Sequence, residues 1–183
     1  AADGIFLTTA GIGVVPPGRV LDYAAARDGD VVLVSGTLGD HGVAVMAQRE
    51  GLGFKTPVAS DAAPLVELVA ALLAAAPGTR CLKDPTRGGL AMALNEIARA
   101  SRHTIVLEES QVPVRPAVAG ACDLLGLDVL TVANEGKVVA VVPAAEAEAA
   151  LAAMRAARYG QDAALVGHVE SGRPQVIGRS ALG

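Results

Sequence analysis

The chain has 183 residues, of which 52% are hydrophobic and only 2% aromatic, and its formal net charge is −4. This length suits one domain, or one domain with a piece of another, and small side chains must fill the core because the sequence contains no tryptophan. The acidic balance argues against a nucleic-acid partner, and the longest apolar run, residues 62–77, contains Glu67 and ends at a proline, so no membrane-spanning segment is predicted.

The first residues differ from the rest of the chain. Residues 4–9 are predicted to form a short strand, which leads into a run of glycines and prolines that ends at Gly18. We interpret residues 1–18 as a remnant of an upstream domain with its linker. Residues 19–183 are then expected to form the domain itself.

Strand and helix signals alternate after this opening segment. Strands are predicted at residues 31–34, 81–83, 104–108, 129–133, 137–142, 163–169 and 175–177. Helices are predicted at residues 40–49, 63–76, 89–101, 116–125 and 144–157. Asp61 is expected to cap the second helix, because its carboxylate can accept the free amide hydrogens of a first turn. This mixture predicts an α/β (α+β) fold, a two-layer sandwich in which helices cover a mixed sheet.

The sequence DPTRGGL at residues 84–90 is the most specific of three segments that could carry chemistry. It follows a short predicted strand and opens a helix, where backbone amides and the helix dipole favour an anion. Its two glycines allow close approach, and Arg87 offers a charged contact to phosphate or carboxylate. Asp84 could hold a metal or orient Thr86. The alternative is a plain strand-to-helix turn in which Asp84 caps the helix and the glycines relieve crowding.

The sequence SGTLGDHG at residues 35–42 also joins a predicted strand to a helix. Its small and hydroxyl-bearing residues could line a phosphate or a peptide tail, with His41 as a proton carrier. The alternative is a tight turn with Asp40 in the first turn of the helix and His41 half exposed.

The sequence NEGK at residues 134–137 lies between two predicted strands. Asn and Gly tolerate positive φ, so a β-hairpin turn is one interpretation. The other makes Glu135 a general base, or a hydrogen-bond anchor, presented at the end of a strand.

The remaining features argue against other kinds of site. The sequence GIG at residues 11–13 lacks a following helix pattern and is not a dinucleotide-binding fingerprint. Cys81 and Cys122 lie far apart without a CxxC pattern, so we interpret them as small buried side chains and predict no metal site. No signal peptide is recognisable, which predicts a cytoplasmic protein.

Taken in order, the three segments resemble motifs of the hydrogenase maturation factor HypE family. The resemblance rests on SGTLGDHG at 35–42, DPTRGGLAMALNEIA at 84–98 and ANEGKVVAVV at 133–142. Residues 4–18 resemble the end of that family's first domain and its linker, and residues 113–128 are also typical, so nearly the whole chain is covered. The DPTRGGL form is specific, because AIR synthase and selenophosphate synthetase, which share the fold, carry a different residue at the position of Arg87.

The resemblance implies a domain like the C-terminal domain of AIR synthase. In the family, a first domain binds ATP and Mg²⁺ and forms the homodimer, and a flexible tail ends in a cysteine. HypF loads a carbamoyl group on that cysteine, and the enzyme dehydrates it to a thiocyanate with ATP. The cyano group then passes to a HypC–HypD complex and becomes a ligand of the iron in [NiFe]-hydrogenase.

The resemblance also suggests roles for individual residues. Glu135 is the candidate catalytic base. The candidates that face phosphate or ATP are Asp84, Thr86, Arg87, Gly88 and Gly89. The candidates that face the cysteine tail are Asp40, His41 and Asn134.

The 183 residues depart from the family pattern because they include neither the expected ATP-binding domain nor the expected cysteine tail. Neither Cys81 nor Cys122 matches the tail cysteine. We therefore expect no cofactor on this chain alone, and no dehydratase activity from it. Two functions stay open for the domain: half of an ATP-dependent dehydratase, or a docking module that holds the tail and contacts HypC–HypD. A third, more distant possibility is another enzyme of the same superfold.

Overall fold

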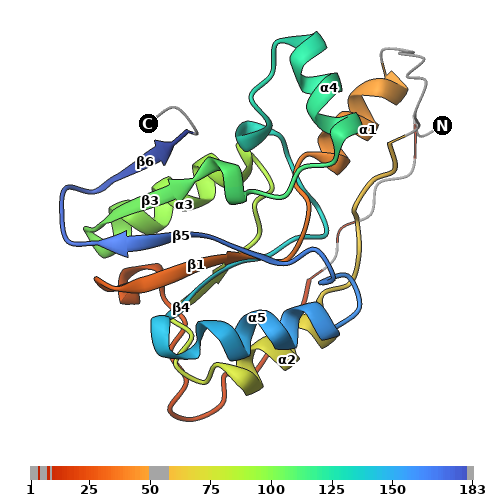
Figure 1. The fold of residues 1–183 in the computed structure, drawn as a ribbon. Coiled ribbons are helices and arrows are strands. Elements are labelled where there is room, and N and C mark those ends of the chain that lie inside the picture. Colours follow the sequence, from red (N-terminus) through yellow and green to blue (C-terminus); the bar gives the residue numbers. More distant parts are fainter. Residues whose placement is uncertain (1–3, 5–7, 9, 50–57, 181–183) are drawn as a thin grey trace.

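A computed structural model describes residues 4, 8, 10–49 and 58–180. The strand predicted at residues 4–9 therefore lies largely outside the described residues. Six strands form one mixed sheet in the order β2-β4-β1-β5-β3-β6 (Figure 1). Their bounds are β1 Asp30–Val34, β2 Cys81–Lys83, β3 Thr104–Glu108, β4 Val139–Pro143, β5 Ala164–Glu170 and β6 Gln175–Arg179. Neighbouring strands run antiparallel, except that β6 runs parallel to β3.

The α-helices agree closely with the predicted ones. Their bounds are α1 Asp40–Arg49, α2 Val66–Ala75, α3 Gly89–Ser101, α4 Pro116–Leu125 and α5 Ala147–Ala156. Short 3₁₀ turns are η1 Tyr23–Ala25, η2 Glu109–Gln111, η3 Val129–Thr131 and η4 Ala144–Glu146. Within the described ranges, no helix combines the length and the apolar character that crossing a membrane requires.

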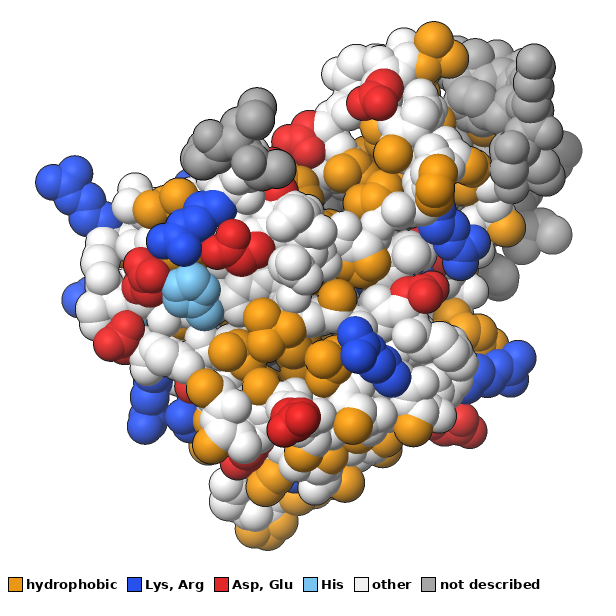
Figure 2. Space-filling view, in the orientation of Figure 1, with side chains coloured by type: hydrophobic (Ala, Val, Ile, Leu, Met, Phe, Trp, Pro, Cys, Tyr) orange, Lys and Arg blue, Asp and Glu red, His pale blue; other side chains and the backbone are white. Residues whose placement is uncertain are grey.

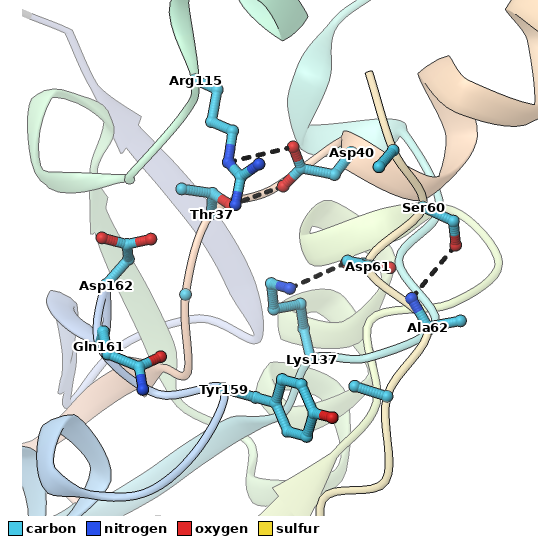
Figure 3. A pocket seen from close by; sticks show the side chains of 13 residues that line it. Thr37, Asp40, Ser60, Asp61, Ala62, Arg115, Lys137, Tyr159, Gln161 and Asp162 are labelled. Carbon is cyan, nitrogen blue, oxygen red and sulfur yellow. Dashed lines mark hydrogen bonds and ion pairs between the residues drawn. The ribbon is translucent and has the colours of Figure 1, made fainter. Parts of the chain in front are cut away.

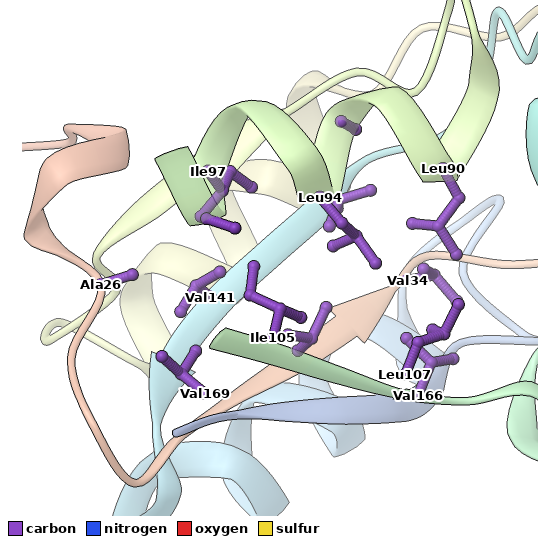
Figure 4. Close-up of a cluster of buried hydrophobic side chains, with 14 of the residues drawn as sticks. Ala26, Val34, Leu90, Leu94, Ile97, Ile105, Leu107, Val141, Val166 and Val169 are labelled. Carbon is purple, nitrogen blue, oxygen red and sulfur yellow. The ribbon is translucent and has the colours of Figure 1, made fainter. Parts of the chain in front are cut away.

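The central strands are apolar on both faces, as expected for strands covered on each side. In β1, Val32 and Val34 point into a core beneath α3 (Figure 4), whereas Leu33 points into a core beneath α2 and α5. This follows from the alternation of side chains along a strand. The predicted α/β fold with helices covering a mixed sheet is confirmed. The helices cover both faces of the sheet, so the domain has three layers rather than the predicted two.

Helices α1 and α4 pack against each other beside the sheet rather than on it (Figure 1). Val43 of α1 meets Val118 and Cys122 of α4 in a third apolar cluster, which also contains Val132. The connection through η3 thus passes directly beneath the starts of α1 and α4.

Three predictions of local structure were wrong. Residues 129–133 form η3 and an extended connection instead of a strand, because Asp128 accepts a hydrogen bond from Leu130 N and starts a 3₁₀ turn. The β-hairpin interpretation of residues 134–137 therefore fails. Helix α2 begins at Val66, and Asp61 does not cap it.

Candidate active-site pocket

A pocket of about 320 Å³ lies where the turn between β1 and α1 meets the segment before β4 (Figure 3). Side chains from five separate stretches of the chain surround it. Its lining residues are Gly36, Thr37, Asp40, Ala59, Ser60, Asp61, Ala62, Ala63, Arg115, Lys137, Tyr159, Gln161 and Asp162.

One wall of the pocket carries a buried carboxylate, Asp40, at the start of α1. Only 1% of Asp40 is exposed. Its Oδ2 accepts a hydrogen bond from the Thr37 hydroxyl, and its Oδ1 lies 3.5 Å from Nε of Arg115. Its position in the first helical turn is as predicted, and the helix dipole favours a negative charge there.

Another wall carries a second buried carboxylate, Asp61. Its Oδ1 accepts hydrogen bonds from the backbone amides of Glu135 (3.0 Å) and Gly136 (3.3 Å). Its Oδ2 lies 3.2 Å from the ammonium of Lys137, and both side chains are more than nine-tenths buried. Because Asp61 bonds three consecutive residues, it fixes the segment that carries Glu135.

Two carboxylate oxygens in this pocket keep unused acceptor capacity. Asp40 Oδ1 and Asp61 Oδ2 are buried and accept no hydrogen bond from any residue that the structure describes, although each lies near a cation. A buried polar atom without a hydrogen-bond partner is costly. A ligand with N–H or O–H groups would satisfy these oxygens.

Asn134 joins the three segments that the sequence singled out. It is fully buried, and its side-chain oxygen accepts from Gly39 N at 2.8 Å. Its side-chain amide donates to the carbonyls of Pro85 and Val132, and its backbone amide also donates to Pro85. Asn134 therefore ties the 35–42 turn and the 84–90 turn to the 134–137 segment from within the protein.

Glu135 lies at the exposed end of this arrangement. Its side chain is exposed and its backbone amide is held by Asp61. The next residue, Gly136, lies so close to the Asp61 carbonyl that a Cβ there would collide with it and would come within 2.8 Å of Ala63 N. The backbone at Glu135 is thus held on a rigid support while its carboxylate remains accessible.

The turn at residues 84–90 opens α3, as predicted, but its residues do not line the pocket. Asp84, Arg87 and Gly88 are exposed and Thr86 is half-buried. Gly89 is buried with φ +60°, and a Cβ there would strike the carbonyls of Leu130 and Val132. The geometry thus shows that Gly89 relieves crowding, while the exposed part of the turn stays accessible to an anion.

His41 does not line the pocket. Its Nδ1 lies 2.9 Å from the Ser60 hydroxyl, and the ring borders a separate groove along α1 that Met46 and Leu127 also line. Of the three tail-facing candidates, only Asp40 therefore lines the pocket; Asn134 supports it from behind.

Sequence reasoning assigned no functional role to Asp61, Lys137 or Arg115, which supply much of the pocket's charge. Lys137 gave the one available signal, because it is a charged residue directly before an apolar strand. Asp61 could not be identified, since its partners lie 74 residues or more away along the chain.

Neither cysteine is an activated thiol. Both are buried, as predicted, and burial raises the pKa of Cys81 to about 12 and also raises the pKa of Cys122. Among the residues that the structure describes, no group of three or more His, Cys, Asp or Glu side chains is arranged to hold a metal ion.

Comparison with known proteins assigns this arrangement to a family. The family described as AIR synthase related protein, C-terminal domain, matches residues 27–179. The carbamoyl dehydratase HypE of Cupriavidus necator is 54% identical over 182 residues, which cover 99% of this chain and 52% of that protein. The chain thus spans about half the length of the curated relatives it matches.

Solved structures give the same result. The crystal structure of HypE in complex with ATP has a TM-score of 0.86 and 44% identity, and the match covers 89% of this chain and 51% of that one. The HypE–HypF complex matches with the same TM-score and identity, over 89% of this chain and 53% of that one. The chain therefore belongs to the AIR synthase related family, as a C-terminal domain of the HypE type.

Proposed function

We propose that the full-length protein containing this domain is an ATP-dependent carbamoyl dehydratase. It converts the S-carbamoylated cysteine at its own C-terminus to a thiocyanate and thereby supplies the cyano ligand of [NiFe]-hydrogenase iron. The observation that carries this proposal is the set of hydrogen bonds from Asn134 and Asp61 that hold residues 134–137. These bonds present Glu135 beside a polar pocket. The names of the relatives support the same reaction.

The dehydration removes an oxygen and two protons from a thiocarboxamide. Bound ATP supplies a phosphoryl group that turns the amide oxygen into a leaving group. In our proposal, the Glu135 carboxylate takes one proton from the nitrogen as general base, the second proton is released to solvent, and the oxygen leaves as part of phosphate. Asp40 faces the tail, since its Oδ1 can accept the N–H of a carbamoyl group.

The exposed part of the 84–90 turn suits a phosphate. Arg87 provides a cation, Thr86 a hydroxyl and Gly88 an exposed backbone at the start of α3. Asp84 is exposed at the same turn and forms no carboxylate cluster in the described part of the chain. We therefore propose that ATP and Mg²⁺ are bound mainly by the upstream domain, with this turn facing the phosphates.

The partners follow from the same proposal. A relative forms a complex with HypF, and we propose that this protein also receives its carbamoyl group from HypF and passes the cyano group to HypC–HypD. We propose that the homodimer forms through the upstream domain. On the face shown in Figure 2, basic and acidic side chains are interspersed.

The test is Glu135→Gln in the full-length protein. Gln keeps the shape of the side chain but loses the basicity, so single-turnover cyanation of the loaded tail should fall by about 100-fold or more. Mass spectrometry of the tail cysteine measures the product. ATP binding and circular dichroism should match the wild type, because the side chain is exposed.

A Glu135→Gln variant that is well folded and turns over at the wild-type rate would remove Glu135 from the mechanism. A wild-type protein that forms no thiocyanate with ATP, Mg²⁺ and a carbamoyl donor would overturn the function itself.

A further inference from the structure

We infer that Asp61 is a positioning residue for the reaction, acting through Glu135. This inference rests on the proposed function, in which Glu135 is the base. Asp61 contacts Glu135 only through the backbone amide, so its own carboxylate is not assigned to proton transfer. Its effect is to fix where the Glu135 side chain begins.

The first observation is the number of contacts that one buried carboxylate makes with one short segment. Asp61 accepts the amides of Glu135 and Gly136 through one oxygen. Its other oxygen pairs with Lys137 (Figure 3). Three consecutive residues are thus bound by a single side chain that is only 3% exposed. Buried charge-assisted hydrogen bonds are stronger than neutral ones and hold geometry tightly.

The second observation is that the backbones themselves are in contact. Gly136 has no Cβ, so its backbone can lie directly against the Asp61 carbonyl. An ideal Cβ on Gly136 would lie only 2.8 Å from Ala63 N. The position of residues 59–63 therefore determines the position of residues 135–137. Any displacement of Asp61 is passed on to Glu135.

The third observation is that both ends of the segment are fixed by contacts other than those of Asp61. Asn134 is bound to Gly39 and Pro85 inside the protein, and Val138 N donates to the Ser35 hydroxyl. Between these two anchors, Asp61 is the side chain that holds Glu135 and Gly136. Loss of the Asp61 contacts would therefore free this short segment without disturbing the sheet beside it.

The test is a double-mutant cycle in the full-length protein. Asp61→Ala should lower single-turnover cyanation by about 10- to 100-fold, the scale of loss that follows from misplacing a reacting group by about 1 Å. In a Glu135→Gln background, the same substitution should change the residual rate by less than about twofold, because the base it positions is already gone. The KM for ATP should not change in either background.

Two further variants separate positioning from folding. The double variant Asp61→Asn/Lys137→Met keeps an oxygen for the two amides. It also lacks the buried Lys137 ammonium that Asp61→Ala leaves unpaired, so it should retain more activity than Asp61→Ala. Asp28→Ala is the matched control, since the Asp28 carboxylate also accepts a backbone amide, that of Ser171, but Asp28 does not line this pocket. It should turn over like the wild type.

Multiplicative losses from Asp61→Ala and Glu135→Gln would overturn the inference while leaving the dehydratase function in place. An Asp61→Asn/Lys137→Met variant no more active than Asp61→Ala, with a normal thermal melt, would also overturn it. Absence of cyanation by the wild type would instead contradict the proposed function.

Discussion

Asn134 shows how one side chain can be wholly occupied with structure inside a segment that carries chemistry. Its oxygen and amide make three hydrogen bonds, all to backbone groups of segments distant in sequence or of Val132. Aspartate would keep the oxygen that accepts from Gly39 but would turn a second oxygen toward two carbonyls. Position 134 therefore requires the amide, and the adjacent Glu135 remains accessible.

We predict that Asn134→Ala lowers the free energy of unfolding by about 2–4 kcal/mol, because buried backbone groups of Gly39 and Pro85 lose a partner. Urea denaturation of this chain measures the change. Asn95→Ala is the matched control: Asn95 also donates to a carbonyl, that of Ala91, but within its own helix and partly exposed. A control that loses as much stability as Asn134→Ala would contradict the assignment.

At the level of elements, the segment from Asp128 to Ala133 explains why the turns at residues 35–42 and 84–90 require glycine. A Cβ on Gly39 would collide with Val118 and Val129, and one on Gly42 with Val132. A Cβ on Gly89 would strike the carbonyls of the same connection. The glycines thus let the starts of α1 and α3 approach one extended segment closely.

This packing marks what could be predicted from the sequence. Helices α1, α3 and α4 were predicted with the observed bounds, because their apolar spacing and end signals are local. The run of β-branched and apolar residues at 129–133 resembles a strand, yet it forms η3 and an extended connection, because the Asp128 side chain starts a 3₁₀ turn and local context overrides strand propensity. The pocket could not be foreseen, because the contacts of Asp61 and Lys137 depend on segments that meet only in the fold.

We predict opposite effects for two glycine-to-alanine substitutions. Gly136→Ala should destabilise the chain by about 1–3 kcal/mol, because the added methyl group meets the backbone of residues 61–63. Gly120→Ala, in the interior of α4 with open space around it, should stabilise the chain by about 0.5–1 kcal/mol. Thermal or urea unfolding compares them, and equal effects at the two positions would argue against a close backbone contact at Gly136.

At the level of the whole molecule, the sheet separates two cores of mostly aliphatic side chains. Cys81 belongs to the core beneath α3, where it packs with Val139 and Val141 of β4. The α1–α4 cluster stands beside these cores and borders the site from another direction. The pocket therefore lies where the sheet, with α2 and α5 beneath it, meets the α1–α4 cluster.

Stability of the whole chain should depend on pH through Cys81. Its pKa is raised from 9.0 to about 12, mainly by burial. Between these values the unfolded chain loses the thiol proton and the folded chain keeps it, so this contribution is complete below pH 9 and is lost as pH rises toward 12. Across that window, wild-type unfolding free energy should fall more steeply than that of Cys81→Ala, by up to about 1.4 kcal/mol per pH unit. Parallel curves in alkaline urea titrations would disprove it.

The long sequence separation of the contacts made by Asn134 has a consequence for the order of folding. Its partners Gly39 and Pro85 lie 95 and 49 residues away, so the chain must close large loops before these bonds can form. Pairing of β1 with β4 joins residues that lie even farther apart in sequence, such as Val34 and Val139, and it brings the segments of Gly39 and Asn134 together before the bonds of Asn134 form. We expect the pocket to form after the folding barrier has been crossed, so that damage to it shortens the lifetime of the folded state but hardly slows the route toward it.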